Sequence, residues 1–127
     1  MNNENDRIMV QKRVGKKICD EAQWIRADDV KRCEKEMFTS KSYKVVIYTD
    51  YGEFVRCDSN DAFLKLMNER EGMMITDTGV LGNLKKMKSV DYKTGKVYFD
   101  EEKNEYITIA RSKTEIVREY IKKLFGK

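Results

Sequence analysis

The chain has 127 residues, of which 40% are hydrophobic and 38% are charged, and its formal net charge is +4. This length predicts one domain with one substantial hydrophobic core. No apolar run approaches the ~18 residues of a membrane span, and the polar start predicts no secretory signal. The absence of histidine excludes Ser-His-Asp and Cys-His catalysis and removes the commonest metal ligand.

The cysteines Cys19, Cys33 and Cys57 are odd in number and lie far apart in the sequence. No CxxC pair of a zinc site is present, so free thiols in the reducing cytoplasm are the prediction. Cys33 and Cys57 fall in strand-like segments, where we expect buried, unreactive thiols. We expect no metal and no cofactor.

The polar residues 1–7 are predicted to be disordered, and residues 8–127 to form the single domain. In the N-terminal part, residues 8–11 are predicted to form a short strand, with Trp24 and Ile25 paired beside it. Residues 12–17 are predicted to form a basic loop around Gly15. Residues 30–36 are predicted to form a strand with a charged outer face.

Two hairpins stand out further along the chain. Residues 44–49 are rich in β-branched and aromatic side chains, and a turn at 50–52 leads into an alternating strand at 53–57. The second hairpin comprises residues 87–92, a turn at 93–95 and a strand at 96–99, and a further strand follows at 104–110. Short strands at such spacing predict a mainly β protein with antiparallel sheets.

Two segments have helical patterns. Residues 60–70 follow Ser59 as a candidate N-cap, place Phe63, Leu66 and Met67 on one face, and are expected to stop at Gly72. Residues 112–125 begin with Ser112 and Glu115 at capping-box spacing. Their apolar stripe, predicted to pack in the core, comprises Ile116, Val117, Tyr120, Ile121, Leu124 and Phe125.

Acidic motifs give little support for an enzyme. Adjacent carboxylates such as Asp28 and Asp29 point to opposite faces of a strand, so we expect turn or edge residues there. Asp77, Thr78 and Gly79 match the letters of the aspartic protease signature. That chemistry needs two carboxylates sharing one proton, and the chain has one copy of the motif. We therefore predict that the protein is not an enzyme.

Basic residues gather at the ends of predicted elements, where loops present side chains to a partner. The three groups are Lys41 and Lys44 around Tyr43, Lys85 and Lys86 with Lys88, and Arg111 with Lys113. Such groups can neutralise nucleic-acid phosphates, but a solvated charged surface explains them equally well. Sequence chemistry alone leaves both alternatives open.

The order of elements and several strings resemble the LytTR DNA-binding domain of bacterial response regulators, over about residues 8–125. The family's characteristic stretch corresponds to residues 73–84, with Asn83 among apolar neighbours. The segment 86–99 is similar to the family's next hairpin, and 106–111 to the strand that ends in a basic residue. Upstream, residues 28–30, 42–54 and 59–67 resemble its early strand, central hairpin and short helix.

This resemblance implies a mainly β fold of antiparallel strands with a short central helix and a C-terminal helix. It also implies binding to double-stranded DNA through loops rather than a recognition helix, by a pair of copies on direct repeats. The family's three contact positions correspond to Tyr43, Thr78 and Arg111. Phosphate contacts are expected from Lys41, Lys44, Lys85, Lys86 and Lys113. No upstream receiver domain is visible, so a stand-alone transcription regulator is the prediction.

The chain departs from the family at the central loop. A basic run with histidine is replaced by residues 75–78, and Asp77 places a negative charge where phosphates would approach. This departure motivates an alternative, in which the fold is kept as a protein-interaction module that has lost DNA binding and modulates a partner regulator.

Overall fold

The computed structural model describes residues 6–56 and 60–126. The strands are β1 (Arg7–Val14), β2 (Lys17–Arg26), β3 (Arg32–Thr39), β4 (Ser42–Thr49), β5 (Gly52–Arg56), β6 (Met73–Asp77), β7 (Val80–Asn83), β8 (Ser89–Asp91), β9 (Lys96–Tyr98) and β10 (Tyr106–Thr108). The α-helices are α1 (Asn60–Asn68) and α2 (Thr114–Phe125), and short 3-10 turns occupy Ala27–Asp29, Leu84–Lys86 and Arg111–Lys113.

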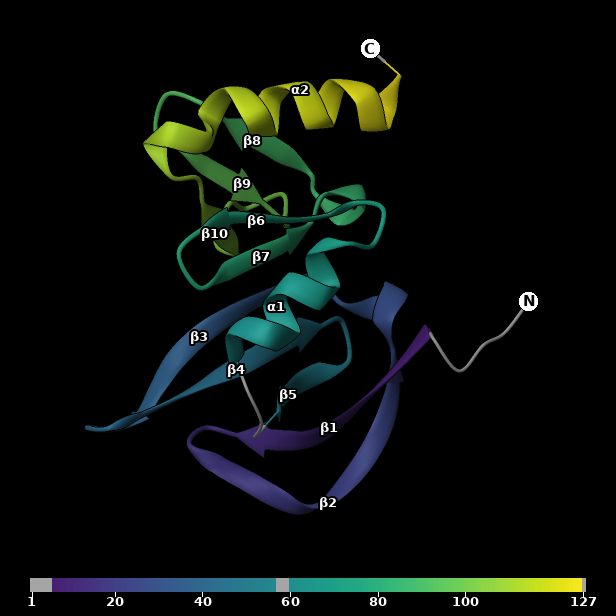
Figure 1. Cartoon of the computed structure of the whole chain (residues 1–127), viewed down its shortest axis with the longest axis vertical. Coiled ribbons are helices and arrows are strands. Elements are labelled where there is room, and N and C mark those ends of the chain that lie inside the picture. Colours follow the sequence, from purple (N-terminus) through teal and green to yellow (C-terminus); the bar gives the residue numbers. More distant parts are fainter. Residues whose placement is uncertain (1–5, 57–59, 127) are drawn as a thin grey trace.

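The strands form two antiparallel sheets (Figure 1). The larger sheet has the order β2-β1-β5-β4-β3-β7-β6, and the smaller has the order β10-β9-β8. The predicted hairpins β4–β5 and β8–β9 are both present, because each turn contains a glycine between strand-forming runs. The mainly β prediction with a short central and a C-terminal helix is therefore confirmed. Neither described helix combines the length and the apolar character that crossing a membrane would require.

The first hydrophobic core lies between α1 and the larger sheet. Phe63, Leu64 and Met67 of α1 are buried against strand residues that include Cys33 and Ile47. The prediction for Leu66 is wrong, since its side chain is 64% exposed and Leu64 takes the core position. The buried stripe has the spacing i, i+1, i+4, which turns the position before Met67 towards solvent.

The second core lies between α2, the smaller sheet and the outer face of β6 and β7. Val117 of α2 is buried with Val97 and Ile107. Gly82 of β7 makes the close approach of the sheets possible, because a Cβ atom there would lie 2.4 Å from Ile107 Cδ1. The core prediction for the α2 stripe holds for Val117, Tyr120, Ile121 and Leu124, whereas Ile116 and Phe125 are exposed.

The N-terminal part forms a hairpin rather than a strand followed by a basic loop. The β1 strand extends to Val14 and β2 begins at Lys17, so the turn is confined to Gly15 and Lys16. Val10 and Ile25 of this hairpin are buried, but Lys12 and Lys17 occupy exposed positions, so lysines fit within its strands. The predicted pairing of the first strand with Trp24 and Ile25 is confirmed.

Element ends differ from the predictions in three places. The first helix ends at Asn68, well before Gly72, and β1 begins at Arg7, within the segment predicted to be disordered. The α2 helix begins at Thr114 with Lys113 as N-cap and without a side-chain cap, so the predicted capping box at Ser112 is not formed. Ser59, Cys57 and residues 1–5 lie outside the described residues. Cys33 is fully buried as predicted, and burial raises the pKa of its thiol.

Candidate nucleic-acid interface

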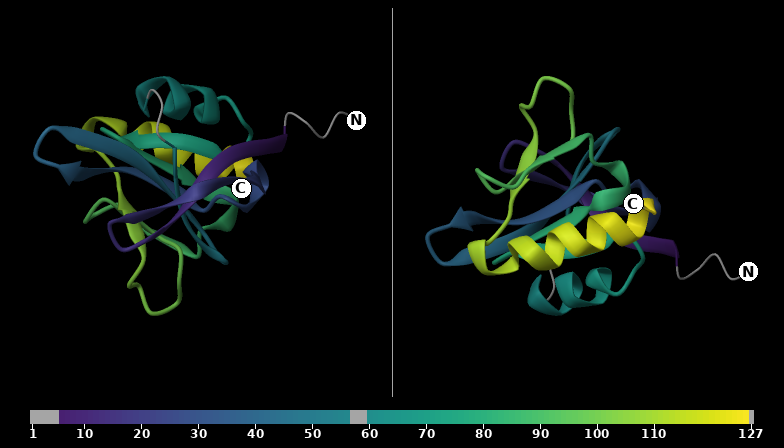
Figure 2. Two further views of the ribbon diagram at one scale, coloured as in Figure 1. Left: turned by 90° about the horizontal axis from the view of Figure 1, so that it is seen from below. Right: turned by 90° about the horizontal axis from the view of Figure 1, so that it is seen from above.

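The three residues at the expected base-contact positions lie along one edge of the molecule. Tyr43 is the second residue of β4 and is 51% exposed, Thr78 lies in the exposed β6–β7 turn, and Arg111 is exposed before α2. Figures 1 and 2 show the end of the β3–β4 hairpin, the β6–β7 turn and the start of α2 on the same side in each view. Lys41 is exposed at the tip of the β3–β4 hairpin. We call Lys41, Tyr43, Thr78 and Arg111 the loop edge.

Lys35 of β3 connects the first two parts of the loop edge. Its backbone N–H donates to the Gly79 carbonyl over 2.9 Å, and its Nζ lies 5.9 Å from the Tyr43 ring centroid. Gly79 has φ +69°, and a Cβ atom there would lie 3.0 Å from Lys35 Cδ. The turn that carries Thr78 therefore requires glycine both for its backbone and for its contact with β3. The sequence analysis did not identify Lys35 as a site residue, because it lies inside a strand rather than at the end of an element.

Asp77 connects the second and third parts. Its Oδ1 accepts the Thr78 N–H over 2.8 Å, and its Oδ2 accepts the Thr108 hydroxyl over 2.7 Å. The Ala110 N–H donates to the Thr76 carbonyl over 2.8 Å, directly before Arg111. Asp77 thus acts as a structural acceptor that fixes the central loop. Its negative charge nevertheless lies in the middle of the loop edge.

Lys44, Lys85 and Lys86 are not brought to the loop edge. Lys44 is paired with Glu36 of β3, and strand alternation directs it to the opposite face from Tyr43. Lys85 and Lys86 occupy the turn at the far end of β7, where Lys85 Nζ binds Glu71 Oε1 at 2.9 Å.

Lys113 lies near the loop edge but is turned inward. Its half-buried side chain donates to the Ile75 carbonyl over 3.2 Å. Lys16, from the turn predicted as a basic loop, reaches β3 near the tip of the β3–β4 hairpin. Its Nζ donates to the Met37 carbonyl over 2.6 Å and lies 5.1 Å from the Phe38 ring centroid.

Asn83, the residue shared with the family's characteristic stretch, has a structural role here. Its side chain is almost fully buried, and its Nδ2 donates to the Val30 carbonyl over 2.9 Å. Its Oδ1 accepts the N–H of Lys85 over 3.2 Å. These bonds join β7 to the start of β3 and open the following turn. Asn83 is therefore not available for a DNA contact.

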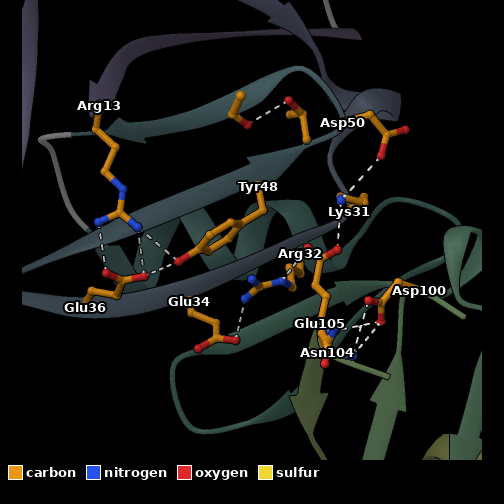
Figure 3. Close-up of polar contacts among 12 residues, drawn as sticks. Arg13, Lys31, Arg32, Glu34, Glu36, Tyr48, Asp50, Asp100, Asn104 and Glu105 are labelled. Atoms are coloured by element: carbon orange, nitrogen blue, oxygen red, sulfur yellow. Dashed lines mark hydrogen bonds and ion pairs between the residues drawn. The ribbon is translucent and has the colours of Figure 1, made fainter. Parts of the chain in front are cut away.

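The face of the larger sheet opposite α1 carries a polar network of half-buried charges (Figure 3). Arg13 NH1 binds Glu36 Oε1 at 3.0 Å, and Glu36 Oε2 also accepts the Tyr48 hydroxyl. Burial acts to raise the pKa of Glu36, but the bonds from Tyr48 and Arg13 outweigh it and lower that pKa. Burial raises the pKa of Glu34, and the attraction of Arg32 offsets only part of that effect.

A second part of this network connects the two sheets. Glu105, which precedes β10, binds Lys31 Nζ and Arg32 Nε, each at 2.9 Å. The Arg32 guanidinium also lies 3.6 Å from the centroid of the Tyr48 ring. We call Arg13, Lys31, Arg32, Glu34, Glu36, Tyr48 and Glu105 the network face. Its cations are matched by carboxylates, unlike Lys41 and Arg111, which form no ion pair with any described residue.

Comparison with known proteins identifies the fold of this chain. No family model and no curated protein matches the sequence. Among solved structures, the chain is similar to the LytTR DNA-binding domain of a methyl-accepting/DNA response regulator from Bacillus cereus. The similarity covers 94% of this chain and 97% of that domain, with a TM-score of 0.60 and 14% sequence identity. The chain therefore has the fold of a LytTR DNA-binding domain, as the resemblance in the sequence predicted.

Proposed function

We propose that the protein is a sequence-specific, double-stranded DNA-binding transcription regulator that contacts DNA through its loop edge. The observation that carries this proposal is that the end of the β3–β4 hairpin, the β6–β7 turn and the start of α2 lie along one side of the molecule (Figure 1), and that Tyr43, Thr78 and Arg111 are exposed in these three parts of the chain. Such a regulator would act in the bacterial cytoplasm, where its DNA target is found.

Each residue of the loop edge has a chemistry suited to this role. Arg111 can make a bidentate contact with guanine O6 and N7, or bind a phosphate. Tyr43 and Thr78 carry hydroxyls that can donate to phosphate oxygens or base acceptors. Lys41 adds a flexible positive charge. Because the central loop is held by Lys35 and Thr108, these side chains are presented from a fixed backbone.

Phosphate contacts are proposed mainly for Lys41, with Lys16 and Lys113 close to the same edge. The positions of Lys44, Lys85 and Lys86 make them unsuited to a duplex bound there. We propose that they belong to the solvated charged surface. Two copies on one DNA site remain our proposal for the bound state.

A second function is favoured by one observation, which is the negative charge of Asp77 within the loop edge. A carboxylate there repels phosphates, and the same edge could instead receive a basic surface of a partner regulator. In that case the chain would modulate the partner without binding DNA itself.

Titration with duplex DNA at about 50 and 200 mM salt separates the two functions. A DNA-binding regulator should bind at the lower salt, weaken steeply at the higher salt, and enrich a defined sequence from a random duplex pool. Asp77→Asn keeps one acceptor oxygen for the Thr78 N–H, and its NH2 group can donate to the Thr108 hydroxyl oxygen, so the loop should keep its structure while binding strengthens. If no binding occurs at the lower salt for either protein, the DNA-binding proposal fails and the partner-regulator function takes its place.

A further inference from the structure

The outer edge of the larger sheet is a long strand that is paired on one side only. Within the part of the chain that the structure describes, β2 pairs with β1 alone, and it forms the end of the sheet (Figure 1). It has ten residues, and most of them are exposed. Unpaired N–H and C=O groups along such an edge are a template for pairing with another strand.

Exposed apolar side chains lie on β2 and on its neighbour β1. Trp24 of β2 is 62% exposed, and its cross-strand neighbour Met9 is 51% exposed. Large aromatic side chains are enriched at protein interfaces, where one face is covered by the partner. Trp24 lies in the segment Ala22–Arg26, which is paired residue by residue with β1 and is therefore regular strand.

We propose that β2 pairs antiparallel with β2 of a second copy of this chain, with Gln23 opposite Gln23 at the two-fold axis. In an antiparallel pair, directly opposite residues project to the same face of the sheet. A two-fold axis that relates the two strands must therefore set one residue opposite itself. Only registers centred on a single residue are consistent with this symmetry.

Charge selects among these registers. Centring on Asp20 or Glu21 would set like carboxylates against each other. Centring on Gln23 sets Asp20 opposite Arg26 at both ends of the overlap and gives two ion pairs. The same register places Trp24 opposite Ala22, whose small side chain leaves space for the indole ring.

A register centred on Cys19 is the competing case. It would set Lys17 opposite Glu21, but its overlap, residues 17–21, is shorter and lies mostly where β2 departs from regular pairing with β1, whereas the Gln23-centred overlap enters that segment only at Asp20 and Glu21. In that segment the Cys19 carbonyl accepts a hydrogen bond from Gln11 Nε2 of β1 over 3.0 Å, so this carbonyl is directed to β1 rather than to the free edge. The Gln23 register is therefore the better supported one.

This inference goes beyond the proposed function, and its test contains no DNA. Sedimentation velocity across a concentration range should show a monomer–dimer equilibrium for the whole chain. Arg26→Glu removes two attractive pairs and introduces two repulsive ones, so the dimer dissociation constant should rise at least about tenfold. Adding Asp20→Arg to that variant should restore the constant to within about threefold of wild type.

Lys17→Glu provides the matched control, because Lys17 lies outside the Gln23-centred overlap and its change should leave the equilibrium unaltered. Arg26 also lies 3.7 Å from Asp28 in its own chain. Rescue by Asp20→Arg cannot restore that contact, so it would report the intermolecular pair alone. A monomeric wild-type chain at about 100 µM, or an absence of rescue, would overturn the proposal.

Crosslinking gives a readout of the register that does not depend on charge. In a Cys19→Ser background, Gln23→Cys should form an intermolecular disulfide under mild oxidation, since the two positions are opposed across the axis. The chain with native Cys19 and Gln23 should not crosslink at Cys19. Crosslinking through Cys19 without crosslinking at position 23 would contradict the proposed register.

Discussion

The loop edge and the network face both carry arginine, lysine and tyrosine, yet their charges are used differently. On the network face, Arg13 and Arg32 have side chains that are 9% and 13% exposed, and carboxylates bind both of them. On the loop edge, Lys41 and Arg111 are exposed and have no ion-pair partner among the described residues. Residue type alone therefore does not distinguish a structural cation from one available for a ligand, whereas burial and pairing do.

Fixed geometry is common to both regions, although it is achieved differently. The network face is held by its own charges, which span β1, β3, β4 and the loop before β10. The loop edge is held by backbone bonds and by Asp77, so its exposed side chains need not hold the fold together. Substitutions on the network face should consequently reduce stability and leave DNA affinity unchanged, whereas substitutions on the loop edge should reduce DNA affinity and leave stability unchanged.

The largest effect is expected on the network face. Glu105→Ala leaves Lys31 and Arg32 half-buried without their shared carboxylate, so it should destabilise the protein by about 2–3 kcal/mol. Urea unfolding measures this loss, and DNA affinity of the folded fraction should not change. Glu102→Ala in the same loop is the control, because Glu102 is exposed. Equal stabilities of the two variants would contradict the account.

Arg111→Ala should have the reverse effect. The melting temperature should stay within about one degree of wild type, because surface changes of this kind alter stability little. Duplex affinity should fall by about 1–3 kcal/mol if Arg111 contacts a base, with relaxed specificity at one position. Lys122→Ala is the control, because it removes an exposed charge on α2, and this variant should bind DNA like wild type. Equal losses of affinity for specific and random duplexes would show that Arg111 contacts a phosphate rather than a base.

Two neighbouring carboxylates of the network face should respond oppositely to neutralisation. Glu36 has a lowered pKa, so its ionised form stabilises the fold above its ordinary value of 4.5, and this stabilisation is lost as the pH falls below it. Glu36→Gln should therefore cost about 1–2 kcal/mol at pH 7. The difference from wild type should shrink in acid, which urea midpoints at pH 7 and pH 3.5 would show.

Glu34 has a raised pKa, so its ionised form is disfavoured by folding and the sign reverses. Glu34→Gln should match or exceed wild-type stability at pH 7, and any advantage should diminish as wild-type Glu34 takes up its proton at lower pH. A clear destabilisation by Glu34→Gln at pH 7 would show that its bond to Arg32 outweighs its burial.

The smallest effect is expected for single lysines. Lys41→Ala should reduce the slope of log affinity against log salt by about 1, whereas Lys85→Ala at the far end of β7 should leave it unchanged. Fluorescence anisotropy over a series of salt concentrations measures both slopes. If Lys85→Ala reduced the slope as much as Lys41→Ala did, the bound duplex would have to extend beyond the loop edge.

Much of this fold was predictable from local patterns. Glycine-containing turns between β-branched runs gave the β4–β5 and β8–β9 hairpins. The full extent of the β1–β2 hairpin was missed, because residues 12–17 are mainly basic and β2 is exposed along most of its length, so β2 lacks the alternation of a half-buried strand. Positions 112–115 match a capping box, but the 3-10 turn at Arg111–Lys113 delays the start of α2.

The candidate site was predictable only in part. Tyr43, Thr78 and Arg111 were chosen from the resemblance to the LytTR family, and the elements that carry them lie along one edge of the molecule. Lys85 and Lys86 are close to Thr78 in sequence, but the intervening strand β7 carries them to the opposite end. Lys44 is next to Tyr43, but strand alternation separates their side chains onto opposite faces. Long-range contacts such as Lys35 with Gly79 have no local sequence pattern.

The most direct test of the central claim is NMR mapping of the DNA-bound surface. A ¹⁵N-labelled chain would be titrated at low salt with the duplex obtained by selection, and amide shift changes would be followed residue by residue. We expect the largest changes at residues 41–43, 77–79 and 110–112, with little change along the network face. Changes centred on residues 84–88 or on Arg13 and Glu36, with none at the loop edge, would contradict the assignment of the loop edge as the DNA-binding surface.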